Sequence, residues 1–324
     1  MGITQQDQVT FSTLVNQVLA GTVANVANGF LVDAQSRWLS PNTLRGYSNE
    51  IKSLIQWLDL QGVIMIEEMT ADVIRKYMLS LKEHRNPGGQ FAGYRVLRQM
   101  TYWWERETDD QYKSPIRKVK PPKVNNQPLP GIKQEEIQAL LKVCTGLTGQ
   151  RDRAVIHFLA DTGVRAAECC DLRISDLDLI NNSAIIQKGK GGKRRIVYYG
   201  QKTRRELRKY LSSRPSARTQ DALFSTDEGQ PLTFHGLRQI VRRRAQQAGI
   251  PEPGLHDFRR FFALTMLRNG ADLISLARLM GHSGITVLQR YLAQVTEDLQ
   301  AVHCKAAHWT EAKATKHILR LYDA

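Results

Sequence analysis

The sequence is short of cysteine, of acidic residues and of long apolar runs. Its 324 residues include only 4 cysteines, two of them adjacent at Cys169 and Cys170, which excludes the disulfide framework of a small secreted protein. The first ten residues lack the basic and apolar regions of a signal peptide, and no apolar run is long enough to cross a membrane. These absences predict a soluble protein of the cytoplasm with no membrane partner.

The shortage of acidic residues leaves a strong positive charge. Lysine and arginine number 46 against 31 aspartate and glutamate residues, which gives a formal net charge of +15. Such a charge favours a polyanionic partner, most often DNA or RNA. A basic surface that serves solubility or an association with ribosomes is the alternative, and charge alone does not decide between them.

The length of the chain predicts two domains. Residues 8–110 carry apolar side chains at helical spacing and indicate an all-helical domain. Residues 111–133 are rich in proline and lysine and indicate a basic linker, which either lies along phosphates or is an ordinary solvated tether. Residues 134–324 then form the second domain.

Two features of the first domain bear on its packing. Ser40-Pro41 is a strong helix start, whereas Asn86-Pro87-Gly88-Gly89 predicts a break, with the next helix expected from about Phe91. The aromatic run at residues 102–104 offers either a platform for stacking bases or part of a core, and its spacing favours the core.

The second domain begins with helices and then changes period. Gly163 fits the left-handed position that ends a helix, and Arg165 follows it with Glu168 three residues on. This spacing lets the carboxylate brace the guanidinium for a phosphate, although an exposed ion pair on a helix is the common alternative. Residues 183–188 and 193–199 alternate as strands do, around a glycine-rich turn that carries Lys190. The predicted fold is mainly α, with a small antiparallel β-sheet in the second domain.

Residues 254–292 hold an unusual set of phosphate-handling side chains. His256 and Arg259 share one face of a predicted helix, because positions three apart are neighbours on its surface. His282 lies in a Gly-His-Ser turn, and Tyr291 lies on a new helix capped by Ser283. The stretch predicts a phosphate site within reach of a tyrosine. Upstream, four arginines on one helix indicate either a row facing phosphates or a solvated face: Arg238, Arg242, Arg243 and Arg244.

Five motifs, in order and spacing, resemble the tyrosine recombinases, also called the phage integrase family. They are TGVRAAE at 162–168, GKGGKRR at 189–195, HDFR at 256–259, GHS at 281–283 and a tyrosine nine residues beyond that histidine. The segment LSPNTLRGY at 39–47 is similar to the start of that family's core-binding domain. The resemblance covers roughly residues 10–295. It implies the simple two-domain type, because too little sequence precedes the first helix for a separate arm-binding domain.

The resemblance implies six catalytic residues: Arg165, Lys190, His256, Arg259, His282 and Tyr291. The tyrosine would attack phosphorus and form a 3′-phosphotyrosyl link, which stores the energy of the diester so that rejoining needs neither ATP nor a metal. The two arginines would bind the non-bridging oxygens, whose charge grows in the transition state.

The histidines and the lysine would handle protons. His256 is expected to act as the base or to assist it, His282 to donate a hydrogen bond to the phosphate, and Lys190 to protonate the leaving 5′ oxygen, with Lys193 as the alternative. Further contacts to DNA are expected from Arg194, Arg242 and Arg260. No cofactor is expected. His303, Cys304 and His308 lack a second ligand pair, so no metal site is expected either.

The implied function is site-specific cleavage and rejoining of duplex DNA that integrates, excises or resolves it, as mobile genetic elements require for transposition. The residues beyond Tyr291 are apolar at helical spacing. In the family that the chain resembles such a tail docks on a neighbouring protomer, so the resemblance implies a homotetramer on two sites or a hetero-oligomer with a paralogue; packing within one chain is the alternative. Two other functions stay open: a type IB topoisomerase that relaxes DNA, and a non-catalytic DNA-binding regulator of the same fold.

Overall fold

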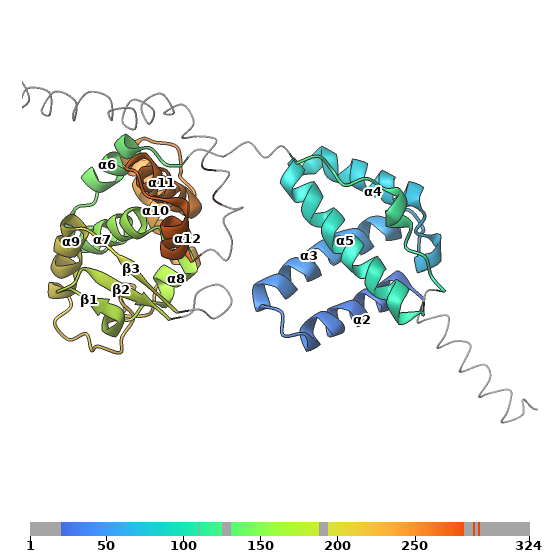
Figure 1. The fold of residues 1–324 in the computed structure, drawn as a ribbon, viewed down its shortest axis with the longest axis horizontal. Helices are drawn as coiled ribbons and strands as arrows, with labels where there is room; N and C mark the ends of the chain where they lie inside the picture. Colours follow the sequence, from blue (N-terminus) through green and yellow to red (C-terminus); the bar gives the residue numbers. More distant parts are fainter. Residues whose placement is uncertain are drawn as a thin grey trace, which may run out of the picture. The chain divides into compact units, whose positions relative to one another are not determined.

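The computed structural model describes residues 21–109, 111–124, 131–187 and 194–281, together with Leu288 and Tyr291. The chain divides into two compact units, Met1–Asn126 and Gln127–Ala324 (Figure 1). Among the helices in these ranges, none combines the length and the apolar character that crossing a membrane requires.

The first unit is a bundle of helices whose starts are set by capping side chains. Its elements are α2 (Val23–Ser36), α3 (Pro41–Leu60), the 3-10 helix η1 (Ile66–Glu68), α4 (Ala71–His84), α5 (Pro87–Glu107) and the 3-10 helix η2 (Pro115–Lys118). Ser40 caps α3 and has proline after it, as the sequence predicts. Asn86 likewise caps α5, with Pro87 at its first position, so this helix begins four residues before the predicted Phe91. The predicted break is therefore a helix start.

The core of the first unit takes in the middle of the aromatic run. Trp103 is buried against Phe30, with ring centroids 6.1 Å apart, which agrees with core packing. Ile116 and Val119 are buried in the same core although they lie in the proline-rich segment, and the hydroxyl of Tyr94 donates to the carbonyl of Val119 at 2.8 Å. The proline-rich segment therefore packs on the first unit for part of its length.

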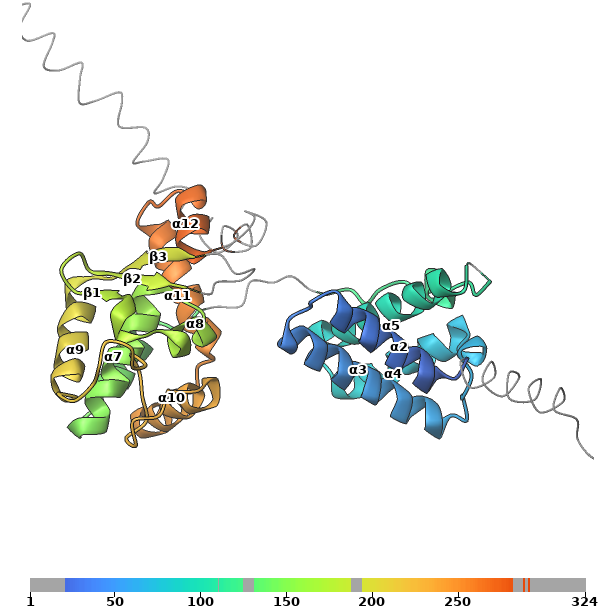
Figure 2. The same cartoon turned by 90° about the horizontal axis from the view of Figure 1, so that it is seen from below.

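The second unit is mainly helical and carries a small sheet, which confirms the predicted fold class. Its helices are α6 (Gln134–Lys142), α7 (Gly146–Thr162), α8 (Ala166–Asp171), the 3-10 helix η3 (Ile174–Asp176), α9 (Gln201–Ser212), α10 (Phe234–Ala248), α11 (Leu255–Arg268) and α12 (Leu273–Met280). Its strands are β1 (Leu177–Asp178), β2 (Ser183–Ile186) and β3 (Arg195–Tyr198), antiparallel in the order β1-β2-β3. The views in Figures 1 and 2 show α7 beside this sheet, and α9 and α11 pack against α7.

The alternation of β2 and β3 decides which side chains face inward. Ala184 pairs with Val197, and both are buried, whereas Ile196 and Tyr198 are exposed. The inward-facing residues of β3 are therefore the odd-numbered ones, so Arg195 points to the same face of the sheet as Val197. The tip of the hairpin, with Lys190 and Lys193, lies outside the described residues.

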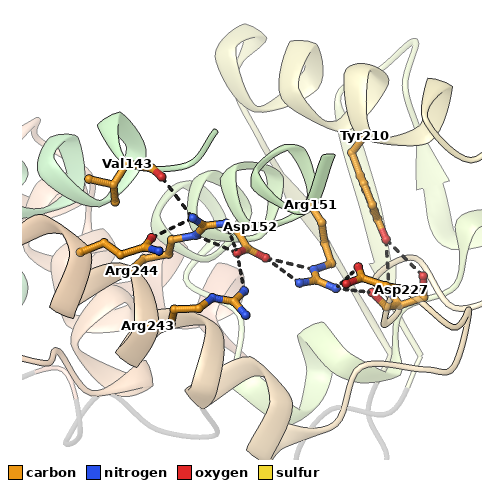
Figure 3. Close-up of polar contacts among 9 residues, drawn as sticks. Val143, Arg151, Asp152, Tyr210, Asp227, Arg243 and Arg244 are labelled. Atoms are coloured by element: carbon orange, nitrogen blue, oxygen red, sulfur yellow. Dashed lines mark hydrogen bonds and ion pairs between the residues drawn. The ribbon is translucent and has the colours of Figure 1, made fainter. Parts of the chain in front are cut away.

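A buried charge network fixes α10 against α7 (Figure 3). Asp152 is fully buried on α7 and accepts hydrogen bonds from Arg244 at 2.8 Å, Arg243 at 2.9 Å and Arg151 at 3.0 Å. Arg244 also donates to the carbonyl of Val143 just after α6, at 3.1 Å. Two of the four arginines of α10, Arg243 and Arg244, thus pair with a buried carboxylate, and Arg244 is itself buried. The four therefore form neither the row facing phosphates nor the solvated face that the sequence left open.

Candidate active site

The turn between α7 and α8 positions the first predicted catalytic arginine. Gly163 has φ +58 and ends α7, and Arg165 then caps α8. The backbone N–H of Arg165 donates to Oε2 of Glu168 at 2.8 Å, and its Nη1 donates to Oε1 at 2.8 Å. The structure therefore contains the brace between carboxylate and guanidinium that the spacing suggested.

Glu168 has a second cationic partner that the sequence reasoning missed. Arg195 donates from Nη1 to Oε1 at 2.9 Å and from Nη2 to Oε2 at 2.7 Å. Burial by itself would raise the pKa of Glu168, but the hydrogen bonds and charges of Arg195 and Arg165 outweigh it and lower the pKa to about 2. Arg195 had a signal in the sequence, because its parity in β3 matches that of the buried Val197.

Helix α11 supplies His256 and Arg259. Arg259 is only 1% exposed; its Nη1 donates to the carbonyl of Gly163 at 2.5 Å and its Nη2 to that of Met280 at 2.6 Å. Burial, followed by the charge of Arg165, lowers the pKa of Arg259 to about 10, so it stays cationic at neutral pH. The two carbonyl contacts fix the plane of the guanidinium before any ligand arrives.

His256 lies one turn before Arg259 on the same helix. Loss of surrounding water, and then the charges of Arg260 and Arg259, lower its pKa below the ordinary value. Its imidazole is therefore neutral at pH 7 and can accept a proton.

The C-terminal end of α12 gathers three guanidinium groups on three successive carbonyls. Arg195 donates to the carbonyl of Leu279 at 3.0 Å, Arg259 to that of Met280 at 2.6 Å, and Arg165 to that of Gly281 at 3.4 Å. The last carbonyls of a helix lack partners within the helix and carry partial negative charge, which cations stabilise. The next residue is His282, which lies outside the described residues.

Tyr291 is buried beside this end of α12. It packs in one apolar cluster with Phe262, Met280 and Leu288, and is 8% exposed. Met280 also supplies the carbonyl that Arg259 binds. The phenol of Tyr291 opposes the lowering of the pKa of Arg259.

Three of the six predicted catalytic residues line one cleft. Arg165, His256 and Arg259 face a space of about 720 Å³ that Phe234 and Arg238 help to enclose. Tyr291 lies in the apolar cluster that includes Met280, whose carbonyl accepts from Arg259. Lys190 and His282 are not described, so the structure does not place them.

The predicted DNA contacts lie on different parts of the second unit. Arg194 is exposed next to the hairpin, and the half-exposed side chain of Arg242 lies 3.8 Å from Glu252. Arg260 is partly buried and donates to Asp257 at 2.6 Å. Across the described ranges, no cluster of three or more His, Cys, Asp or Glu side chains is arranged to hold a metal ion; His303, Cys304 and His308 lie outside those ranges.

The chain is similar in sequence to a large group of known proteins. Residues 131–297 match the model of the phage integrase family. The chain is 31% identical over 278 residues to tyrosine recombinase XerC 2 of Ralstonia nicotianae, covering 82% of this chain and 80% of that protein. It is 29% identical over 275 residues to tyrosine recombinase XerD of Neisseria meningitidis serogroup B, covering 82% and 92%.

Solved structures share the fold at lower identity. The XerH site-specific recombinase, bound to a palindromic difH substrate in a post-cleavage complex, matches with a TM-score of 0.67 and 19% identity over 86% of this chain and 83% of that one. The Tn1549 transposon integrase, in complex with transposon right end DNA, matches with a TM-score of 0.68 and 19% identity over 87% and 99%.

Proposed function

The chain belongs to the phage integrase family, and from this premise we propose that it is a tyrosine-type site-specific recombinase that cuts and rejoins duplex DNA through Tyr291. The observation that carries the catalytic assignment is the meeting of Arg165, Arg259 and His256 at one cleft, with Tyr291 in the apolar cluster of Met280, whose carbonyl Arg259 binds. Two fixed cations, a neutral imidazole and a phenol are the groups that transfer of a phosphodiester to an oxygen nucleophile requires.

The proposed reaction exchanges one ester bond for another. The phenolic oxygen of Tyr291 attacks phosphorus while the bond to the 5′ oxygen breaks, which leaves a 3′-phosphotyrosyl link and a free 5′-hydroxyl. An unperturbed phenol has a pKa of about 10, so attack at neutral pH needs a group that takes the proton. His256 is neutral because its pKa is lowered, and it serves as that base or assists it. Lys190 gives a proton to the departing oxygen, and attack by a 5′-hydroxyl reverses the sequence.

The two arginines act on the non-bridging oxygens. Charge grows on these oxygens in the pentacoordinate transition state, so donors fixed beforehand bind that state more tightly than the ground state. Arg259 is held by Gly163 and Met280, and Arg165 is held by Glu168, so neither guanidinium has to be ordered during the reaction.

The test uses a nicked substrate that traps the covalent adduct. Tyr291→Phe keeps the ring in its apolar cluster, so we expect normal folding and DNA binding with no protein–DNA adduct on a denaturing gel. Tyr198→Phe is the matched control, because Tyr198 is 58% exposed on β3 and should form the adduct as the wild type does. An adduct that survives in Tyr291→Phe would exclude this nucleophile.

The net charge of +15 and the transposon right end DNA in the complex of the Tn1549 integrase support duplex DNA as the partner. We propose that the protein meets this DNA in the cytoplasm. On the same premise we propose a tetramer on two recombination sites, alone or with a paralogue, that integrates, excises or resolves DNA in transposition. The mass of the complex formed with paired sites tests this assembly. Monomers that relax supercoiled DNA without exchanging strands would instead indicate a topoisomerase.

A further inference from the structure

Arg195 makes three directed polar contacts from a nearly buried position. Its side chain is 11% exposed. Both Nη atoms donate to the two oxygens of Glu168, at 2.9 and 2.7 Å, while Nε donates to the carbonyl of Leu279 at 3.0 Å. The planar guanidinium binds both oxygens of a carboxylate through one edge and a carbonyl through another, and an ammonium group cannot reproduce this planar bidentate geometry.

These contacts connect three segments that carry proposed catalytic groups. Glu168 is the carboxylate that holds Arg165. Leu279 belongs to the last turn of α12, which ends at Met280, and Gly281 and His282 follow that helix. Arg195 itself begins β3, so it fixes the chain where the hairpin with Lys190 returns to the sheet.

The stem of Arg195 also lies against the turn before His282. Gly281 has φ +64, and a Cβ at this position would lie 3.0 Å from Cδ of Arg195 and 3.1 Å from its Nε. The side chain therefore covers the backbone of this turn as well as bonding to the helix that precedes it. Displacement of Arg195 would break the contacts that connect Glu168 to the end of α12.

We infer that Arg195 is a positioning residue of the recombination reaction, which holds the Glu168–Arg165 pair and the end of α12 in one arrangement. The inference rests on the proposed function. Arg195 acts through these neighbours. Its contribution depends on the planar, forked arrangement of its N–H donors as well as on the positive charge opposite Glu168.

The competing explanation is that Arg195 only neutralises a buried carboxylate. Arg195→Lys separates the two, because it keeps the charge and loses the fork. A positioning role predicts that Arg195→Lys binds the site with unchanged affinity and cleaves it about 10²-fold more slowly, since misplacement of reacting groups by about 1 Å has that effect. Simple neutralisation predicts wild-type cleavage.

The matched control is Arg244→Gln. Arg244 has a side chain 5% exposed, pairs with the buried Asp152 and bonds to the carbonyl of Val143 near the end of another helix, so it repeats the contacts of Arg195 outside the cleft (Figure 3). We expect Arg244→Gln to lower the melting temperature and to cleave at the wild-type rate per folded molecule.

The experiment is single-turnover cleavage of the nicked substrate, below the melting transition of every variant and normalised to the DNA-binding fraction. A double-mutant cycle with Arg165→Lys then tests whether Arg195 acts through Arg165. If it does, the fold-decrease in cleavage rate of the double variant is smaller than the product of the fold-decreases of the two single variants. Cleavage by Arg195→Lys as fast as by Arg244→Gln, or fully multiplicative losses, would overturn the inference. Failure of the wild type to form an adduct would instead refute the proposed function.

Discussion

Gly163 offers the sharpest test of how α7 and α11 hold Arg259. It has φ +58, a conformation that side chains with a Cβ rarely adopt, and a Cβ built there would lie 2.3 Å from Cδ1 of Phe262. Its carbonyl accepts from Nη1 of Arg259, and Phe262 lies three residues beyond Arg259 on α11. Gly163→Ala therefore pushes on the helix that carries the arginine.

A comparison with Gly249 separates the backbone cost of Gly163→Ala from the cost of its steric clash. Gly249 ends α10 with φ +66, and a Cβ there would meet nothing within 4 Å. Gly249→Ala thus carries only the left-handed backbone cost of about 1–2 kcal/mol. Gly163→Ala carries the same cost plus about 1–3 kcal/mol for overpacking against Phe262. We expect the free energy of unfolding to fall by roughly 2–5 kcal/mol for Gly163→Ala.

The two variants should also differ in activity. A shift of Phe262 moves Arg259 with it, so we expect Gly163→Ala to cleave the nicked substrate at least about 10-fold more slowly, and Gly249→Ala to cleave it normally. Urea denaturation gives the stabilities, and single-turnover cleavage gives the rates. Equal losses of stability would show that the Phe262 ring yields freely, and an unchanged rate for Gly163→Ala would refute the link between this glycine and the arginine.

Three further predictions concern charge. The pKa of Glu168 is lowered to about 2 in the folded protein, whereas its unfolded value is 4.5. The ionised carboxylate therefore stabilises the fold above pH 4.5, and this stabilisation is lost as the pH falls toward 2. In acid denaturation, the stability advantage of the wild type over Glu168→Gln, about 3 kcal/mol, should shrink between these two pH values. Arg260 lowers the pKa of His256, so Arg260→Gln should move the acid limb of the cleavage rate to higher pH, and an unmoved limb would count against His256 as the base. Arg242 is half-exposed, so Arg242→Gln should change the free energy of unfolding by less than about 0.5 kcal/mol. If Arg242 binds a phosphate, the variant should reduce the slope of log K for DNA binding against log salt concentration by about one. An unchanged slope would exclude Arg242 from the DNA interface.

The sequence predicts those parts of the fold that depend on neighbours along the chain. The start of α3, the left-handed end of α7 and the alternation of β2 and β3 are all local, and all are present. The start of α5 was misplaced because Asn-Pro-Gly-Gly is both a turn signal and a capped helix start, and only packing decides between them. Strand β1 is two residues long, too short for any alternation to predict it.

The site divides in the same way. Motif spacing identified Arg165, His256 and Arg259, which line one cleft. The fate of the arginines on α10 was not predictable, because Asp152, the partner of Arg244, lies 92 residues away in the sequence. Arg195 was overlooked for a similar reason: its parity marks it as inward-facing, but only the fold brings it to Glu168.

The charges around the cleft support the proposal that it binds a phosphodiester. Arg165 and Arg195 both donate to the carboxylate of Glu168, and burial together with the charges of Arg165 and Arg195 lowers the pKa of Arg259 to about 10. The carbonyls at the end of α12 supply partial negative charge that holds these cations in place while no anion is bound. An arriving phosphate therefore meets donors that are already oriented and a positive charge that is incompletely compensated. In the proposed reaction the transition state carries more negative charge than the bound diester and relieves more of this repulsion, so the arrangement would lower the barrier as well as bind the substrate.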